Sequence, residues 1–186
     1  MKKTKQTVIA FTLLLISLCY FLFWQVELEK RLVYPFAYSE YIFRYAEEEG
    51  INPKLVASVV LAESKFNIRA ESHRGAVGLM QIMPETGAWI AATKPYDGYK
   101  PEMLKEIPVN LALGTWYLNY LLKEFHGNTI LALAAYNAGR GHVEDWIQQY
   151  QWTTDFNNID EIPFAETREY IKLVLQNEKE YDKLYK

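Results

Sequence analysis

Glu63 is the residue whose charge conflicts most with its predicted surroundings. Val56, Val59 and Val60 precede it by seven, four and three residues, so a helix through this segment places all four side chains on one face. Burial of an unpaired carboxylate is unfavourable enough that the group binds a proton instead, and its pKa rises toward the range that a general acid needs. The spacing therefore makes Glu63 a candidate for acid–base chemistry.

Two simpler explanations of Glu63 are open at this point. The side chain could extend past the end of its helix into solvent, or it could pair with Arg69 or Arg74. Either arrangement would make it an ordinary structural charge.

The loop that follows Glu63 is built from small and hydrogen-bonding residues. Gly75 and Gly78 permit a close backbone approach or a positive φ, and Ser72 lies in the same stretch. Gln81 offers both donors and an acceptor to a polar ligand. Loops of this composition build polar ligand clefts, so we expect one beside the end of the Glu63 helix.

Two later clusters carry further polar side chains. Tyr136 and Asn137 end one predicted helix with an aromatic ring and an amide side by side, and Glu166 and Tyr170 open the last one. Taken singly, Asn137 is equally well explained as a helix terminator and Tyr170 as a core aromatic.

Other catalytic chemistries find little support. His73, His126 and His142 are too scattered to form a metal-ligand pattern, and no motif places a histidine beside a nucleophilic serine or cysteine. The single cysteine, Cys19, lies in an apolar N-terminal segment, so the rest of the chain cannot form a disulfide. We predict neither a metal nor a cofactor.

Apolar stripes separated by helix-ending residues predict the elements that position these side chains. The pattern favours a mainly α-helical domain whose helices pack around a common core, without strands of useful length. Helices are expected over residues 38–49, 53–65, 84–92, 110–125, 129–138, 143–150 and 165–185.

The first 26 residues have a different composition. Three lysines precede an uncharged run of 21 residues, Gln6–Val26, which as a helix spans roughly 32 Å, about one bilayer core. We predict a transmembrane anchor over residues 6–26, with the lysine end in the cytoplasm and the domain outside. The alternative is a signal segment that is cleaved, followed by secretion.

The remainder divides into a short stalk, residues 27–37, and a domain, residues 38–186. With 17 Lys and Arg against 23 Asp and Glu, everything beyond residue 26 carries a net charge of −6. Such an acidic domain is a poor nucleic-acid binder. About 150 residues suffice for a packed core.

Together, the clusters resemble one family. The stretch Glu63–Gly87 (ESKFNIRAESHRGAVGLMQIMPETG) looks like the signature of soluble lytic transglycosylase catalytic domains, which are related in fold to goose-type lysozyme. Asn110 with its following residues, Ala134–Gly139 and Ile162–Tyr170 are similar to later motifs of that family, in the same order. The resemblance covers about residues 40–175. Ile68 and His73 stand where the family often has proline, which leaves the assigned roles intact.

The resemblance implies a lysozyme-like helical fold with a long cleft for the glycan strands of peptidoglycan. It makes Glu63 the single catalytic acid. The positions matching substrate-binding residues are Ser72, Met80, Gln81, Tyr136, Asn137, Glu166 and Tyr170. Tyr136 or Tyr170 is expected to hold Glu63 through a phenolic hydrogen bond.

The implied reaction breaks the β-1,4 bond between N-acetylmuramic acid and N-acetylglucosamine without consuming water. One alternative is a hydrolytic muramidase, which would need a second carboxylate to place a water molecule; Glu71, Asp97 and Glu166 are the candidates. Another is a membrane-tethered glycan-binding protein with an inactive cleft. Product analysis separates the three.

Overall fold

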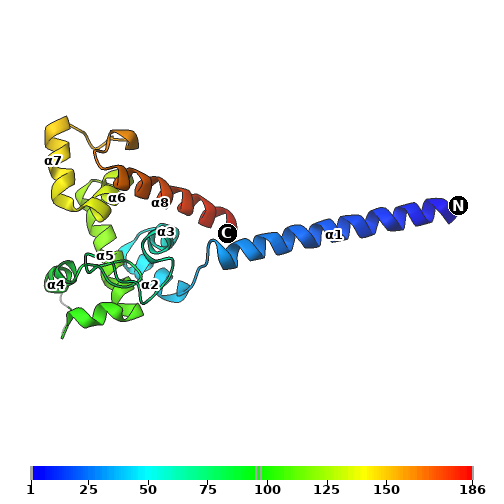
Figure 1. Cartoon of the computed structure of the whole chain (residues 1–186), viewed down its shortest axis with the longest axis horizontal. Helices are drawn as coiled ribbons and strands as arrows, with labels where there is room; N and C mark the ends of the chain where they lie inside the picture. Colours follow the sequence, from blue (N-terminus) through cyan, green and yellow to red (C-terminus); the bar gives the residue numbers. More distant parts are fainter. Residues whose placement is uncertain (1, 95, 97, 186) are drawn as a thin grey trace.

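The computed structural model describes residues 2–94, 96 and 98–185, and its regular structure is helical (Figure 1). Within these residues, β-structure is limited to two isolated bridges, Glu71–Val77 and Val77–Ile82. This confirms the predicted mainly α class. The helices are α1 (Lys2–Leu32), α2 (Ser39–Glu49), α3 (Pro53–Ser64), α4 (Pro84–Thr93), η1 (Pro101–Lys105), α5 (Ile107–Glu124), α6 (Thr129–Ala138), α7 (Arg140–Tyr150), η2 (Ile159–Glu161) and α8 (Ala165–Leu184).

The helix ends follow local sequence signals. The Asn52 side chain accepts a hydrogen bond from the Lys54 amide (3.0 Å), and Pro53 occupies the first helical position of α3. Asn128 caps α6 in the same way, by accepting from the Leu131 amide at 3.0 Å. The helices predicted from these signals are confirmed, including the start of α3 after Asn52.

Two helices begin earlier than predicted, each by three residues. α5 starts at Ile107, because Pro108 fits the first turn of a helix, where its missing N–H is not needed. α7 starts at Arg140, directly after Gly139, whose φ of 98° allows the chain to turn sharply from α6 into α7.

The core lies where α3 packs along α8 and where α5 packs between α2 and α6. Each of these helices contributes apolar side chains that are fully buried: Ile42, Val59, Leu118, Leu133 and Ile171. The core therefore surrounds α3, the helix that carries Glu63.

The loop between α3 and α4 is fixed to α5 by one buried side chain. Asn110 accepts from the Met80 amide (2.8 Å) and donates to the carbonyls of Val77 and Leu104, both at 2.8 Å. Gly78 passes so close that a Cβ atom there would lie 2.7 Å from the Leu104 carbonyl oxygen. Asn110 thus satisfies the Met80 amide and the Leu104 carbonyl, and it gives the Val77 carbonyl a second donor besides the Ile82 amide.

The predicted stalk has two structural parts. α1 continues through Leu32, so residues 27–32 are helical, and residues 33–38 connect α1 to α2 without forming a helix. This connection packs against the C-terminal end of α8, and Figure 1 shows the C-terminus beside the end of α1. Residues 27–37 are therefore not a flexible linker between the anchor and the domain.

We predict that Asn110→Ala destabilises the protein by about 2–4 kcal/mol, because the Met80 amide and the Leu104 carbonyl lose their side-chain partner. Chemical denaturation of the full-length protein in detergent measures the change. The matched control is the exposed Asn157→Ala, which should lie within about 0.5 kcal/mol of the wild type. Equal effects of the two substitutions would contradict the role given to Asn110.

Candidate active site

Glu63 lies in the last turn of α3, where the chain changes direction sharply. Lys65 and Phe66, directly after the helix, both have positive φ values of 52° and 61°. The Lys65 amide still bonds to the Leu61 carbonyl, so the last turn stays closed while the chain leaves α3 for the loop. This exit leaves the carboxyl of Glu63 at the rim of the core, with one side open.

Burial raises the pKa of Glu63 from its ordinary value of 4.5 to about 7, and interaction with the Tyr170 hydroxyl opposes part of that rise. The side chain is half-buried. No ion pair of Glu63 with Arg69, Arg74 or another cation occurs in the described part of the chain. Neither of the simpler explanations of Glu63 therefore fits the structure.

Two tyrosine hydroxyls lie near this carboxyl and differ in what they contact. The Tyr136 hydroxyl donates to the Met80 carbonyl at 2.8 Å and so fixes the loop. The buried Tyr170 hydroxyl makes no hydrogen bond of ordinary length to a described residue, which leaves Glu63 as the group it approaches. Burial, together with the nearby Glu63, raises the pKa of both phenols well above the usual value. Both therefore remain neutral donors.

A cleft of about 550 Å³ opens over Glu63. Its walls come from the loop after α3, from the C-terminal end of α6 and from the start of α8. The structure brings six of the predicted site residues together in its lining: Glu63, Ser72, Gln81, Tyr136, Asn137 and Glu166.

Two polar side chains of the cleft, Gln81 and Asn137, are each held by hydrogen bonds from one part of the amide group, which leaves the other part free. Gln81 uses its amide hydrogens on the carbonyls of Ala70 (3.2 Å) and Gly78 (2.9 Å), which leaves its side-chain oxygen as an acceptor. Asn137 accepts from the Thr167 hydroxyl at 2.7 Å, which leaves its amide hydrogens as donors. The walls thus present preset donors and acceptors to a polar ligand.

Met80 and Tyr170 do not line this cleft. The Met80 side chain is fully buried. A Cβ atom added at Gly114 would lie only 2.7 Å from the Cβ atom of Met80. The missing side chain of Gly114 therefore makes room for Met80 beneath the cleft floor. Met80 supports the site through its carbonyl, and Tyr170 lies behind Glu63.

Several lining residues did not emerge from the sequence as site residues. Tyr117 of α5 lies against the Tyr136 ring, with centroids 5.6 Å apart, and it also borders a second hollow of about 340 Å³. Trp89 and Tyr120 line that hollow and pack edge-on at 5.1 Å. Tyr117 belongs to the motif that begins at Asn110, whereas the only sequence signal for Trp89 and Tyr120 was the high aromatic content of 15%.

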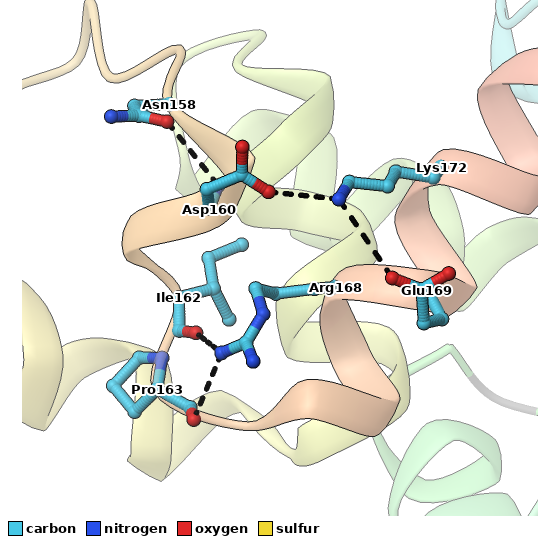
Figure 2. Close-up of polar contacts among 7 residues, drawn as sticks. All are labelled: Asn158, Asp160, Ile162, Pro163, Arg168, Glu169 and Lys172. Carbon is cyan, nitrogen blue, oxygen red and sulfur yellow. Dashed lines mark hydrogen bonds and ion pairs between the residues drawn. The ribbon is translucent and has the colours of Figure 1, made fainter.

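The start of α8, which carries Glu166, is held by charged side chains (Figure 2). Arg168 donates to the carbonyl of Ile162 (2.6 Å) and more weakly to that of Pro163 (3.2 Å). Lys172 bonds to Asp160 at 2.8 Å, which lowers the pKa of that exposed carboxyl. The turn before α8 is thereby fixed relative to the helix, and with it the position of Glu166.

The three candidates for a second carboxylate separate clearly. Glu71 is exposed, pairs with Lys105 at 3.6 Å and does not border the cleft. Asp97 lies outside the described residues. Glu166 lines the cleft that contains Glu63. In the described part of the chain, no group of three or more His, Cys, Asp or Glu side chains is arranged to hold a metal ion.

These features define a class of protein: a helical domain with one proton-binding carboxyl at the end of a core helix, inside a cleft of amide, hydroxyl and aromatic groups. Residues 40–159 match the model of the transglycosylase SLT domain. The chain belongs to the transglycosylase SLT domain family, which confirms the resemblance seen in its motifs.

Individual relatives agree with this assignment. The chain is 37% identical over 162 residues to the soluble lytic murein transglycosylase of Salmonella typhimurium, a match that covers 86% of this chain and 24% of the relative. It is 30% identical over 166 residues to the membrane-bound lytic murein transglycosylase C of Actinobacillus pleuropneumoniae, which covers 77% of this chain and 45% of the relative.

A solved structure shares the fold. This is the lytic transglycosylase Slt of Pseudomonas aeruginosa, crystallised as an inactive mutant in which glutamine replaces one glutamate. It superimposes with a TM-score of 0.74 at 33% identity, over 84% of this chain and 25% of that one. The predicted lysozyme-like, lytic-transglycosylase fold is confirmed. The chain spans about a quarter of the length of the Salmonella relative.

We predict that Glu63→Gln stabilises the fold at pH 8 but not at pH 4. Because the folded-state pKa is raised, the stability that protonated Glu63 contributes is full below its ordinary pKa of 4.5 and is lost as the pH rises through about 7. The variant avoids this loss, so its advantage should grow by at most about 3 kcal/mol between the two pH values.

Denaturant unfolding at both pH values checks this prediction. Glu47→Gln, an exposed position on α2, is the matched control and should change stability little at either pH. A Glu63→Gln effect independent of pH would mean that the carboxyl is not held in a desolvated environment.

Proposed function

We propose that this chain is a membrane-anchored peptidoglycan lytic transglycosylase. It cleaves the β-1,4 bond between N-acetylmuramic acid and N-acetylglucosamine and leaves 1,6-anhydromuramic acid ends, with Glu63 as the only general acid and base. The observation that carries the proposal is a half-buried carboxyl in a polar cleft with a pKa of about 7. Such a carboxyl holds a proton near neutral pH and can also give it up.

The reaction proceeds in two proton transfers. Protonated Glu63 donates to the glycosidic oxygen as its bond to the muramic anomeric carbon breaks, so N-acetylglucosamine leaves with a hydroxyl. The muramic 6-hydroxyl then attacks the same carbon, and its proton passes to the Glu63 carboxylate. The acid is regenerated and no water is consumed. Because the nucleophile belongs to the substrate, its effective concentration is high and no second carboxylate has to activate water.

The surrounding residues divide into binding and positioning groups. Ser72, Gln81, Asn137 and Glu166 contact the sugars from the cleft walls, and the Tyr136 ring forms part of the same surface. Tyr170 orients the carboxyl of Glu63 and favours its ionised form, as the second step requires. Met80 maintains the floor through its bond with Tyr136. The reaction needs no cofactor.

The proposed anchor would hold the catalytic domain at the outer side of the membrane. One stretch of α1, Phe11–Leu32, is long and apolar enough by length and composition to cross a bilayer, with a mean hydropathy of 1.8. The lysines before the predicted 6–26 span favour a cytoplasmic N-terminus and a domain outside the membrane, where the glycan strands lie. A relative described as membrane-bound supports this arrangement.

A hydrolytic muramidase is the second candidate, because Glu166 lines the same cleft as Glu63. In that reaction Glu166 would place a water molecule on the anomeric carbon and the product would be a reducing end. Glu166 would then be indispensable, whereas in the transglycosylase reaction it only binds substrate. An inactive glycan-binding scaffold would release no fragments at all.

We predict that the full-length protein in detergent digests purified peptidoglycan to anhydromuropeptides, and that Glu63→Gln lowers the rate by at least about 100-fold. Activity should fall as the pH rises above about 7, since Glu63 must start protonated. Mass spectrometry of the products and initial rates across pH measure both effects.

The controls separate the alternatives. Glu166→Gln should retain anhydro products with weaker substrate binding, whereas complete loss together with reducing-end products in the wild type would establish the muramidase. Glu71→Gln, outside the cleft, should behave like the wild type. Normal digestion by Glu63→Gln would remove the assigned acid.

A further inference from the structure

The connection between α1 and α2 is bonded to the end of α8 that lies far from the cleft. The Tyr185 hydroxyl lies 2.7 Å from the Tyr34 carbonyl and 3.3 Å from the Lys30 carbonyl, and donates its proton between them. The Tyr181 hydroxyl donates to the Pro35 carbonyl at 2.6 Å, and the Tyr181 residue is fully buried. Two carbonyls of the connection and one from the last turn of α1 are therefore held by two tyrosines at one helix end.

Aromatic packing reinforces these bonds. The Phe36 ring lies between those of Phe43, Tyr181 and Tyr185, with centroid distances of 5.4, 5.3 and 5.1 Å. The Tyr34 ring meets Tyr181 edge-on at 5.9 Å. We call this assembly the junction; it consists of Lys30, Tyr34, Pro35, Phe36, Phe43, Tyr181 and Tyr185.

α3 and α8 run antiparallel from the junction to the catalytic carboxyl. At the junction end Lys54 pairs with Asp182 at 3.0 Å, and Asn52 donates to Glu178 at 2.9 Å. At the other end Glu63 of α3 meets Tyr170 of α8. The two helices thus form a strut, and the 11 residue steps from Tyr170 to Tyr181 correspond to about 16 Å of helix rise.

We propose that the junction and the strut hold the cleft at a fixed height above the membrane, so that the domain cuts glycan strands at that height in preference to strands lying on the bilayer surface. This rests on the anchored glycan-cleaving function proposed above. Counted from Val26, where the uncharged run ends, the helical residues 27–32 add about 9 Å to the roughly 16 Å of the strut, so Glu63 lies at most about 25 Å above that run. Figure 1 shows α8 leading away from the junction on the side opposite α1.

A flexible stalk would behave differently. Eleven unstructured residues, the length of the predicted segment 27–37, have a root-mean-square span of roughly 18 Å and would let the domain sample many heights, including contact with the lipid. Here six of those residues are helical, and three of the remaining five belong to the junction. The number of free residues is too small for such sampling.

The test uses the full chain in lipid vesicles, with Cys19→Ser and a dye attached through Gln148→Cys on exposed α7. Energy transfer from this dye to headgroup-labelled lipids reports the height of the domain. We expect weak transfer with a single lifetime in the wild type. Phe36→Ala combined with Tyr185→Phe should give stronger transfer with several lifetimes.

Two further variants keep the test sharp. Tyr185→Phe alone preserves the ring packing and should shift transfer in the same direction by less, even if Phe36→Ala impairs folding. Tyr41→Phe on α2, whose ring stacks on Tyr45 outside the junction, is the matched control and should match the wild type. Broad, strong transfer in the wild type would overturn the fixed height.

Strand selection is measured in the same vesicles as the cleavage rate of lipid-linked glycan divided by that of free glycan. The ratio should rise roughly threefold or more in Phe36→Ala with Tyr185→Phe, while cleavage of free glycan stays unchanged. An unchanged ratio despite a mobile domain would overturn the selection of strands by height. If the wild type cleaves no free glycan, the proposed function fails, and the transfer measurement still decides the fixed height.

Discussion

The carboxyl of Glu63 has to bind a proton near neutral pH, and partial exclusion of water is what makes this possible. α3 provides that environment by continuing the apolar face formed by Val56, Val59 and Val60, all fully buried, to the point where the helix ends. Ion pairing would lower the pKa again, and Glu63 makes no ion pair with a described residue. Three segments surround the Glu63 carboxyl: the loop after α3, the end of α6 and the start of α8. They cover one side of the carboxyl and leave the other side open to the cleft.

What could be predicted from the sequence was local. Helix starts at Asn52 and Asn128 depend on residues two or three positions away, and the conflict between Glu63 and its valines lies within two helical turns. The burial of the Met80 side chain depends instead on the space left by Gly114, which is remote in sequence. Position in a motif cannot tell a side chain that lines a cleft from one that lies beneath it.

The two tyrosines illustrate the same limit. The family resemblance left Tyr136 and Tyr170 as equal candidates for the hydrogen-bond partner of Glu63. Packing separates them: the Tyr136 hydroxyl donates to the Met80 carbonyl, whereas the Tyr170 hydroxyl has no such partner among the described residues and interacts with Glu63. This difference depends on how α8 packs against α3 and α6, which is a property of the assembled core.

The boundary of the stalk has a physical cause that links the anchor to the site. Residues 27–32 (ELEKRL) are good helix formers, so α1 continues past the apolar run until Pro35 disfavours helix at the residue before it. The chain then turns where the hydroxyls of Tyr181 and Tyr185 donate to the carbonyls of Pro35 and Tyr34. Because α8 also carries Tyr170, one helix determines both how the domain meets its anchor and how the acid is held. A change in the packing of α8 against α3 would therefore disturb the orientation of the domain and the pKa of Glu63 together.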